Sequence, residues 1–117
     1  MYPSTAGLLV AGEGLYPDEA LYSADGYLLA FQNSDGNLVI YQLPEWNAPW
    51  ATGVVKPESW PGVLVMQGDG NLVIYDTAGE PVWDSGTWNH LGAYFVLESG
   101  VGTIYDASGQ SVLWSRP

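Results

Sequence analysis

The sequence predicts an all-β fold made of three repeated units. Its apolar runs are short and rich in Val, Ile, Leu, Tyr and Trp, they are broken by Gly, Asp, Asn and Pro, and no stretch has helical periodicity. A motif, Gln67-Gly-Asp-Gly-Asn-Leu-Val-Ile-Tyr75, also occurs almost unchanged 34 residues earlier, where it ends at Tyr41. A third, eroded copy ends at Tyr105. Such self-similarity indicates supersecondary units that share one core.

A tryptophan near the end of each copy supports the same period, because Trp50, Trp83 and Trp114 lie 33 and 31 residues apart. We therefore interpret residues 1–117 as a single domain with a lead-in over residues 1–19 and units over about 20–53, 54–86 and 87–117. One unit cannot bury its apolar face alone, so the units must pack on one another. The sequence predicts a three-sided β assembly with these tryptophans near its axis.

The second unit contains the best-defined hairpin. Two apolar runs flank Gly68-Asp-Gly70, a three-residue loop in which Gly70 is available for the left-handed position that such loops require. Gln67 then faces Asn71, and side chains alternate between the two faces of the sheet. The predicted core face carries Leu64, Met66, Leu72 and Ile74, and the opposite face carries Gln67, Asn71, Val73 and Tyr75.

The first unit has one more residue in the same hairpin. A four-residue loop, Asn33-Ser-Asp-Gly36, accommodates it and keeps Gln32 opposite Asn37. We therefore prefer Gln32 as the counterpart of Gln67. Counting back from the tyrosine of the motif favours Asn33 instead, and the sequence leaves both assignments open.

The third unit has lost most of the motif. Where the polar side chains and the valine should stand, it has Leu97 or Glu98, Ser99, Val101 and Thr103. Only Tyr105 remains. We expect this third site to be inactive.

The charge balance excludes several classes of partner. The chain has a formal net charge of −11, and its only cations besides histidine are Lys56 and Arg116. Binding of nucleic acid or of an anionic membrane surface needs clustered Lys and Arg, so neither partner is expected. No apolar run approaches the roughly 20 residues that span a bilayer, so we expect no membrane insertion.

Few features bear on localisation. The N-terminus has no charged segment followed by an apolar one, so we expect a soluble chain without a signal peptide. The sequence contains no cysteine, which excludes disulfides and Cys-based metal sites. This composition fits a cytoplasmic location without excluding secretion.

The polar face of the second hairpin is a candidate binding site. Gln67, Asp69, Asn71 and Tyr75 bring amide, carboxylate and phenol groups together beside Val73, which we expect to be exposed. These groups supply hydrogen-bond donors and acceptors at fixed angles. Adjacent sugar hydroxyls each donate and accept, and the valine methyls can lie against ring C–H groups. The set therefore predicts carbohydrate binding, with charge-assisted bonds to the carboxylate as the strongest contacts.

Other interpretations of these residues are weaker. In most hairpins Asp and Asn simply shape the turn, but here a Gln and a Tyr accompany them. A glycosidase needs two carboxylates roughly 5–10 Å apart. Asp35 and Asp69 are repeat-equivalent and should lie on different sides of the assembly. His90, the only histidine, has no activated nucleophile nearby in the sequence and is expected at the surface.

A calcium site is not expected either. Asp69, Asn71 and Glu80 match positions 1, 3 and 12 of an EF-hand loop, but Val73 and Ile74 occupy positions 5 and 6. We therefore predict that the chain binds no metal.

The remaining alternative is a structural or protein-interaction module that keeps the fold and binds no sugar. The intact motif of the second unit argues against it. Trp46, Trp60 and Trp88 lie outside the axial set in loop-like segments. They could line a glycan or protein surface, or lie partly buried under those loops.

The motif Gln67-x-Asp-x-Asn-x-Val-x-Tyr75 resembles the signature of the monocot mannose-binding lectin family, also called bulb-type or snowdrop-type lectins. The similarity covers about residues 5–117 and includes the three units and the tryptophan that ends each of them. The resemblance implies a β-prism of type II, in which three four-stranded antiparallel sheets surround a pseudo-threefold axis. It also implies metal-independent, non-catalytic binding of terminal α-D-mannose, with no cofactor.

The resemblance assigns a role to each residue of the motif. Asp69 and Asn71 would bond the axial 2-hydroxyl of mannose, which distinguishes it from glucose. Gln67 would bond the 3-hydroxyl and Tyr75 the 4-hydroxyl, while Val73 packs on the ring. The equivalent residues of the first unit are Gln32, Asp35, Asn37, Val39 and Tyr41.

Two further expectations come from the family. The resemblance implies a homodimer formed by exchange of C-terminal strands, here Gln110–Arg116, which would cover an open sheet edge and present four sites. The disulfide common among plant members is absent because the chain has no cysteine. We therefore expect a microbial or fungal member.

Overall fold

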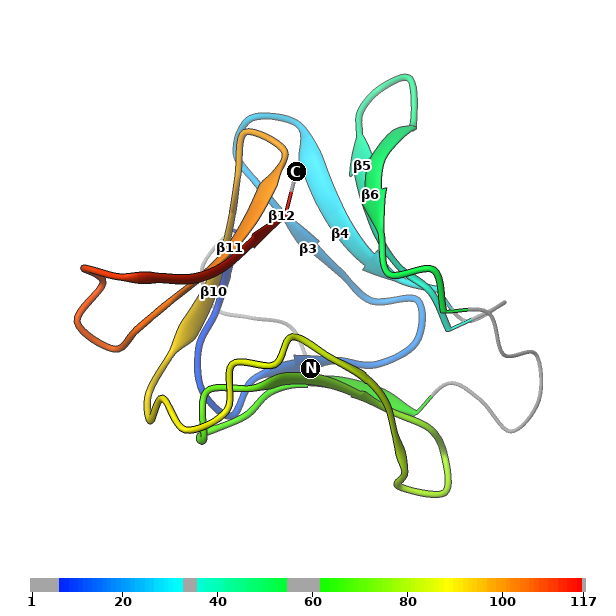
Figure 1. The fold of residues 1–117 in the computed structure, drawn as a ribbon. Helices are drawn as coiled ribbons and strands as arrows, with labels where there is room; N and C mark the ends of the chain where they lie inside the picture. Colours follow the sequence, from blue (N-terminus) through cyan, green and yellow to red (C-terminus); the bar gives the residue numbers. More distant parts are fainter. Residues whose placement is uncertain (1–6, 33–35, 55–61, 117) are drawn as a thin grey trace.

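The structure, a computed structural model, describes residues 7–32, 36–54 and 62–116. In these residues, twelve strands form three four-stranded antiparallel sheets. Figure 1 shows the sheets as three sides of a triangle around a common axis. The predicted all-β class and the prism of three antiparallel sheets are confirmed. The described part of the chain contains no helix long and apolar enough to cross a membrane.

Each sheet combines one strand from the N-terminal region with three later strands. The strand order is β3-β4-β5-β6 in the sheet of the first unit, β2-β7-β8-β9 in that of the second and β1-β10-β11-β12 in that of the third. The strands are β1 Leu8–Leu9, β2 Gly14–Leu15, β3 Ala20–Tyr22, β4 Tyr27–Phe31, β5 Leu38–Gln42, β6 Asn47–Ala51, β7 Val63–Met66, β8 Leu72–Tyr75, β9 Pro81–Asp84, β10 Tyr94–Glu98, β11 Val101–Tyr105 and β12 Val112–Arg116.

The N-terminal residues connect the three sheets. The strand β1 pairs with β10, and β2 pairs with β7, where Gly14 lies opposite Val65. A Cβ atom on Gly14 would lie 2.3 Å from the carbonyl oxygen of Leu64, so only glycine allows this approach. Residues that the sequence places in a lead-in thus form one edge strand in each of two sheets, β1 in one and β2 in the other. Each pairs with a strand from a distant part of the chain.

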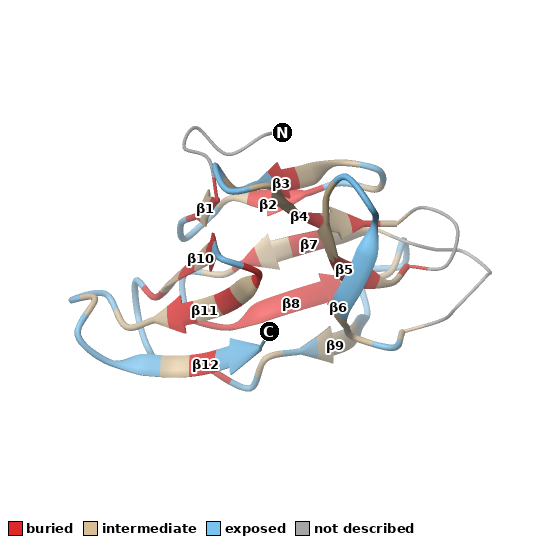
Figure 2. Ribbon diagram, turned by 90° about the horizontal axis from the view of Figure 1, so that it is seen from above, coloured by how far each residue is buried: buried red, intermediate tan, exposed pale blue. Residues whose placement is uncertain are grey.

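Burial follows the period of the strands. In β7 and β10 buried residues alternate with partly exposed ones, as expected for a sheet with one face on the core. Figure 2 shows buried residues in all three sheets, with β8 buried along most of its length. The inner strand β8 is therefore covered on both faces over residues 72–74.

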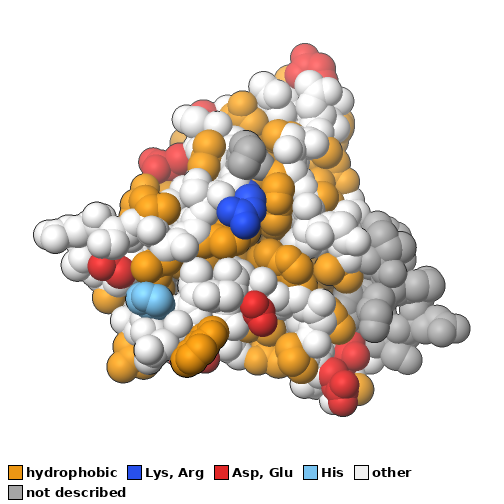
Figure 3. Space-filling model, viewed as in Figure 1, with side chains coloured by type: hydrophobic (Ala, Val, Ile, Leu, Met, Phe, Trp, Pro, Cys, Tyr) orange, Lys and Arg blue, Asp and Glu red, His pale blue; other side chains and the backbone are white. Residues whose placement is uncertain are grey.

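The three repeat-equivalent tryptophans meet at the axis, as predicted. Their ring centroids are 6.1 Å apart for Trp50 and Trp83, 5.5 Å for Trp50 and Trp114, and 6.0 Å for Trp83 and Trp114, all edge-to-face. The Arg116 guanidinium lies 4.9 Å from the Trp114 centroid. Figure 3 shows basic side-chain atoms near the centre of this face, with hydrophobic side chains around them. A hollow of about 270 Å³ opens there, lined by the three indoles. These tryptophans join the last strands of the three sheets, β6, β9 and β12.

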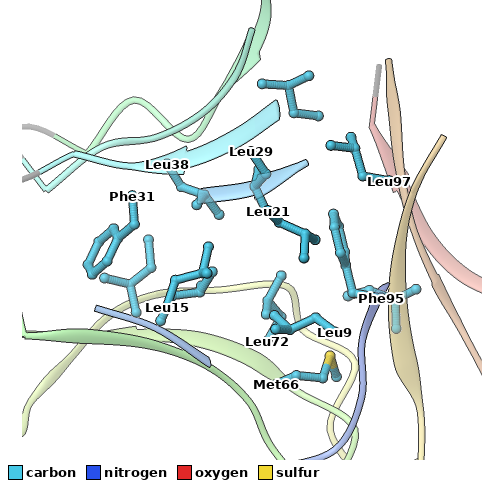
Figure 4. Packing of buried hydrophobic residues seen from close by; sticks show 14 of the residues in the cluster. Leu9, Leu15, Leu21, Leu29, Phe31, Leu38, Met66, Leu72, Phe95 and Leu97 are labelled. Carbon is cyan, nitrogen blue, oxygen red and sulfur yellow. The ribbon is translucent and has the colours of Figure 1, made fainter. Parts of the chain in front are cut away.

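One apolar core fills the space between the sheets (Figure 4). The predicted core face of the second hairpin is confirmed, because its four apolar side chains have no exposed surface: Leu64, Met66, Leu72 and Ile74. Phe31 and Phe95 bring the other two sheets into the same cluster. Leu9 and Leu15 add the N-terminal strands, so no sheet buries its inner face without the other two.

Candidate functional site

The tip of the hairpin between β7 and β8 has the predicted geometry. The Gln67 backbone N–H donates to the Asn71 carbonyl oxygen at 2.9 Å, and the Gly70 N–H donates to the Gln67 carbonyl oxygen at 3.0 Å. Gly70 is left-handed, with φ +96°. A Cβ there would lie 2.4 Å from the carbonyl oxygen of His90 and 2.8 Å from that of Thr87. The loop needs glycine both for its conformation and for its contact with the segment after β9.

Asp69 shapes this turn and remains accessible. Its Oδ1 accepts a hydrogen bond from the Asn71 backbone N–H at 2.9 Å, and its carbonyl oxygen accepts one from the His90 N–H at 2.9 Å. The side chain is exposed. An ionised carboxylate has lone pairs for several partners, so the turn contact leaves capacity for a ligand hydroxyl.

Asn71 is the most enclosed polar side chain of the set, with 8% of its surface exposed. Its Oδ1 accepts from the Thr87 backbone N–H and from Ser85 Oγ, both at 3.1 Å. The two contacts fix the orientation of the amide plane. They commit the oxygen to the protein, so the Nδ2 amino group is the end that could donate to a ligand.

Gln67 and Tyr75 are joined through their side chains. Gln67 Nε2 donates to the Tyr75 hydroxyl, and both residues are half-buried. Because the hydroxyl oxygen accepts from Gln67, its own proton can be donated elsewhere, and Gln67 Oε1 keeps its acceptor capacity. The pair therefore offers one donor and one acceptor in a fixed relation.

The valine of the motif is buried, not exposed as the sequence led us to expect. Val73 and its counterpart Val39 are each 3% exposed. Val73 lies in the central strand β8, directly opposite Val65 of β7 and Asp84 of β9. Cross-strand neighbours on both sides cover most of its surface. The valine can offer only a small apolar patch beside the polar groups.

The first unit repeats the arrangement. The Gln32 backbone N–H donates to the Asn37 carbonyl oxygen at 2.9 Å, and Gln32 Nε2 donates to the Tyr41 hydroxyl. Both bonds match those of Gln67. Gln32 thus has the position of Gln67 in the hairpin, in agreement with the preferred assignment, and the alternative, Asn33, lies outside the described residues.

The asparagine of the first unit is also held through its oxygen. Asn37 Oδ1 accepts from Thr52 Oγ1 at 2.7 Å and from the Gly53 backbone N–H at 3.0 Å. Asn71 is held in the same way, by a hydroxyl and a backbone N–H from the segment that follows the last strand of its sheet, β9. Asp35 lies outside the described residues, so the carboxylate of the first unit stays a prediction.

The third hairpin has a different tip. The register of β10 and β11 pairs Glu98 with Val101, so Glu98, rather than Leu97, has the position of the motif glutamine. Ser99 and Gly100, with φ of 51° and 78°, form a two-residue turn. This loop is shorter than the loops of the other two units. Its side chains also do not reproduce the polar set of those units.

The remaining tyrosine of the third unit is engaged by another ring. Tyr105 stacks on Tyr94 with centroids 5.6 Å apart. The tip itself contacts the turn before β4, where Asp25 accepts from Ser23 Oγ at 2.5 Å and from the Ser99 backbone N–H at 2.8 Å. The hydrogen bond from Ser23, followed by those from Ser99, lowers the pKa of the Asp25 carboxyl.

Sequence reasoning missed the residues that hold the two asparagines. These are Thr52 in the first unit, and Ser85 and Thr87 around the second. A signal for two of them exists in the sequence. Thr52 and Ser85 each stand two residues after the axial tryptophan and just before a glycine, whereas the third unit has Arg116 at that position.

Two tryptophans outside the axial set are exposed. Trp46 has 59% and Trp88 has 64% of its surface exposed, and Trp60 lies outside the described residues. The rings of Trp46 and Tyr41 pack edge-to-face, with their centroids 5.4 Å apart and their planes at 71°. An exposed indole thus lies directly beside the tyrosine of the first unit.

The described residues contain no group of three or more His, Cys, Asp or Glu side chains that could hold a metal ion. The exposed His90 has its Nδ1 3.1 Å from the carbonyl oxygens of Thr87 and Trp88, so its ring contacts its own loop.

A scan against protein-family models finds no match, and a search of curated proteins finds none. Solved structures do match. The chain is 34% identical to a monomeric monocot mannose-binding lectin from Gastrodia elata, over 95% of this chain and 96% of that one, with a TM-score of 0.81. It is 31% identical to the mannose-specific agglutinin of snowdrop (Galanthus nivalis) bulbs, solved with methyl-α-D-mannoside, over 85% and 88% of the two chains, with a TM-score of 0.73.

A more distant match has the same fold. A lectin from Marasmius oreades is 23% identical, over 98% of this chain and 94% of that one, with a TM-score of 0.80. At this identity the likeness concerns the fold alone. Together these matches agree with the three-sheet prism described above.

Proposed function

This chain belongs to the monocot mannose-binding lectin family, and from that premise we propose that it is a non-catalytic lectin that recognises terminal α-D-mannose. One observation carries the proposal. In both units that keep the motif, the glutamine amide donates to the tyrosine hydroxyl and the asparagine oxygen is held by the protein. The same preoriented set of polar groups therefore occurs twice in one chain.

We assign the contacts of the second unit as follows. The Asp69 carboxylate accepts from the axial 2-hydroxyl, and Asn71 Nδ2 donates to the same oxygen. Gln67 contacts the 3-hydroxyl and Tyr75 the 4-hydroxyl. A hydroxyl bound by both an acceptor and a donor is held in one direction, which favours mannose over its 2-epimer glucose because the equatorial hydroxyl points elsewhere. Val73 contributes a small apolar contact to the ring.

The first unit is assigned in the same way, with Gln32, Asp35, Asn37 and Tyr41 as the polar groups and Val39 as the apolar contact. No step breaks a covalent bond and no metal takes part. Single sites with so few contacts bind weakly, so two sites per chain raise the affinity for branched glycans through multivalency.

Calorimetric titration with methyl-α-mannoside tests the proposal, with methyl-α-glucoside as the epimer control. We expect two sites per chain for the mannoside and at least tenfold weaker binding of the glucoside. Asn71→Ala should remove one site and Asn37→Ala the other, because each loses the donor to the 2-hydroxyl. The double variant should bind no mannoside.

The rival is a protein of the same fold that binds no sugar. It predicts no heat with either glycoside and no effect of the asparagine substitutions. Unchanged binding in the double variant would also reject our assignment, because the sugar would then bind elsewhere.

We also propose the homodimer that the family resemblance implied, with Gln110–Arg116 exchanged between chains. Here β12 pairs with β11 of the same chain and carries Trp114 into the axial set. An exchanged strand could make the same contacts with a partner. Light scattering after size exclusion should give twice the chain mass of 12.6 kDa. A mass equal to one chain would reject the dimer, and the Gastrodia elata lectin is itself described as monomeric.

A further inference from the structure

Trp46 is exposed and yet placed beside a residue of the candidate site. It lies in the turn between β5 and β6, where its backbone N–H donates to the Gln42 carbonyl oxygen at 2.8 Å. Its ring meets Tyr41 edge-on at 5.4 Å, and 59% of its surface is open to solvent. Tyr41 in turn accepts from Gln32 Nε2. The indole therefore extends the row of candidate site residues by one aromatic group.

The backbone of Trp46 is unusual for so bulky a residue. Its φ is +64°, in the left-handed region that favours glycine. The corresponding turns of the other two units have Gly79 and Gly109 in this conformation, with φ of 84° and 77°. All three residues donate their backbone N–H to the carbonyl oxygen at the start of the turn, which lies three residues earlier for Gly79 and Gly109 and four residues earlier for Trp46, so the first turn is one residue longer. Only the first unit has a tryptophan where the fold itself favours glycine, and strained residues of this kind cluster at functional sites.

The rest of the second turn also differs. It runs from Asp76 to Glu80 and is closed by Asp76 Oδ1, which accepts from the Ala78 and Glu80 backbone N–H groups. No aromatic side chain occurs between these residues. Tyr75 therefore has no counterpart of Trp46 in its own turn, and the two candidate sites differ beyond the shared motif.

We propose that Trp46 forms a second sugar subsite, which holds the hexose residue next to the mannose bound at the first unit. This inference rests on the proposed function. A pyranose ring has a face of C–H groups that packs on an indole, and Trp46 is exposed where a glycan would pass over Tyr41. The first unit is thus a disaccharide site and the second unit a monosaccharide site.

The test uses single-site proteins, so that each unit is measured alone. Asn71→Ala leaves the first site, and Asn37→Ala leaves the second. Each is titrated with methyl-α-mannoside and with the α1→2, α1→3 and α1→6 mannobioses. At least one mannobiose should bind the first site about two- to tenfold more tightly than the monosaccharide, the range of one aromatic contact. No mannobiose should show such a gain at the second site.

Trp46→Gly then removes the indole and introduces glycine, the residue found in the turns of the other two units. In the protein with only the first site, it should abolish the mannobiose gain and leave monosaccharide binding within about twofold. Added to the protein with only the second site, it should change nothing. Trp46→Phe should keep part of the gain. The thermal unfolding midpoint of Trp46→Gly should be no lower than that of the parent, which excludes misfolding as the cause.

The outcomes separate the two proposals. If neither single-site protein binds methyl-α-mannoside, the proposed function is wrong, and the subsite proposal is then wrong as well. If the monosaccharide binds the first site but no mannobiose binds more tightly, or if the gain survives Trp46→Gly, the subsite is wrong and the lectin function stands. Binding only at the second site would also overturn the subsite.

Discussion

Thr87 and Asn71 are joined across 16 residues of sequence, since the Thr87 backbone N–H donates to Asn71 Oδ1 at 3.1 Å. The Thr87 hydroxyl also donates to the carbonyl oxygen of Gly70 at 2.5 Å. Thr87 is 4% exposed and follows the last strand of the second sheet. The orientation of a candidate sugar-binding amide therefore depends on a segment outside its own hairpin.

Thr87→Val should destabilise the protein and weaken its second site. The substitution keeps the shape of the side chain but leaves the Gly70 carbonyl oxygen without its donor, which costs about 1–3 kcal/mol for a buried group. Urea denaturation measures this loss, and titration in the Asn37→Ala background measures mannoside binding. Thr87→Ser keeps the hydroxyl and should behave like the parent. A Val variant as stable as the parent would show that the hydroxyl contributes nothing.

Gly70→Ala should be far more damaging than Gly68→Ala, although both lie in the same loop. A Cβ on Gly70 meets the His90 carbonyl oxygen at 2.4 Å, whereas one on Gly68 meets nothing within 4 Å. With the left-handed backbone of Gly70, we expect a loss of about 1–3 kcal/mol or more for Gly70→Ala and less than about 0.5 kcal/mol for Gly68→Ala. Equal unfolding midpoints for the two variants would contradict this account.

Trp114→Ala should cost about 3–5 kcal/mol, because it opens a cavity where three indoles pack. Trp114 is 9% exposed and contacts both other axial rings. Trp88→Ala is the matched control, since that ring is 64% exposed and its removal should change the unfolding free energy by less than about 0.5 kcal/mol. Chemical denaturation compares them, and a Trp114 variant of parental stability would mean that the axial set is dispensable.

Asp25 should make the free energy of unfolding depend on pH in the acidic range. Hydrogen bonds, chiefly that from Ser23 Oγ, lower its pKa in the folded state below the ordinary value of 3.8. A group with a depressed folded pKa stabilises the fold above its unfolded pKa and loses this effect as the pH falls through the folded value. Asp25→Asn should therefore lower the urea midpoint at pH 7, and the difference from the parent should shrink as the pH drops below about 3.8.

Ser23→Ala provides the control for this prediction. It removes the largest cause of the lowered pKa while leaving the carboxyl in place. The pH dependence attributable to residue 25 should then become smaller. A constant difference between the parent and Asp25→Asn at every pH would show that the carboxyl contributes through something other than its charge.

The repeat and its hairpins could be read from the sequence because they depend on local chemistry. Gly70 takes the left-handed position, and Gln67 faces Asn71, as the spacing of the loop predicts. The same rule, applied to a loop one residue longer, led to Gln32 rather than Asn33. The axial tryptophans followed from equivalence, since three copies of one unit around an axis bring equivalent side chains together.

Several features of the site depend on residues that no local rule connects. Val73 is buried because β7 and β9 flank it, and the sequence does not say which strands lie beside a given one. Thr87 reaches Asn71 from the segment after β9. The strands β1 and β2, two residues each, are too short to show a periodic pattern.

The sequence by itself determined the class of fold, the threefold repetition and which side chains face outward at the second hairpin, because turn chemistry and the period of two act within a few residues. Only the tertiary structure decided which side chains are covered and which amide oxygen is already engaged. Those properties depend on contacts between distant segments, such as Leu9 with the core of three sheets, and such contacts form only when the whole chain has packed.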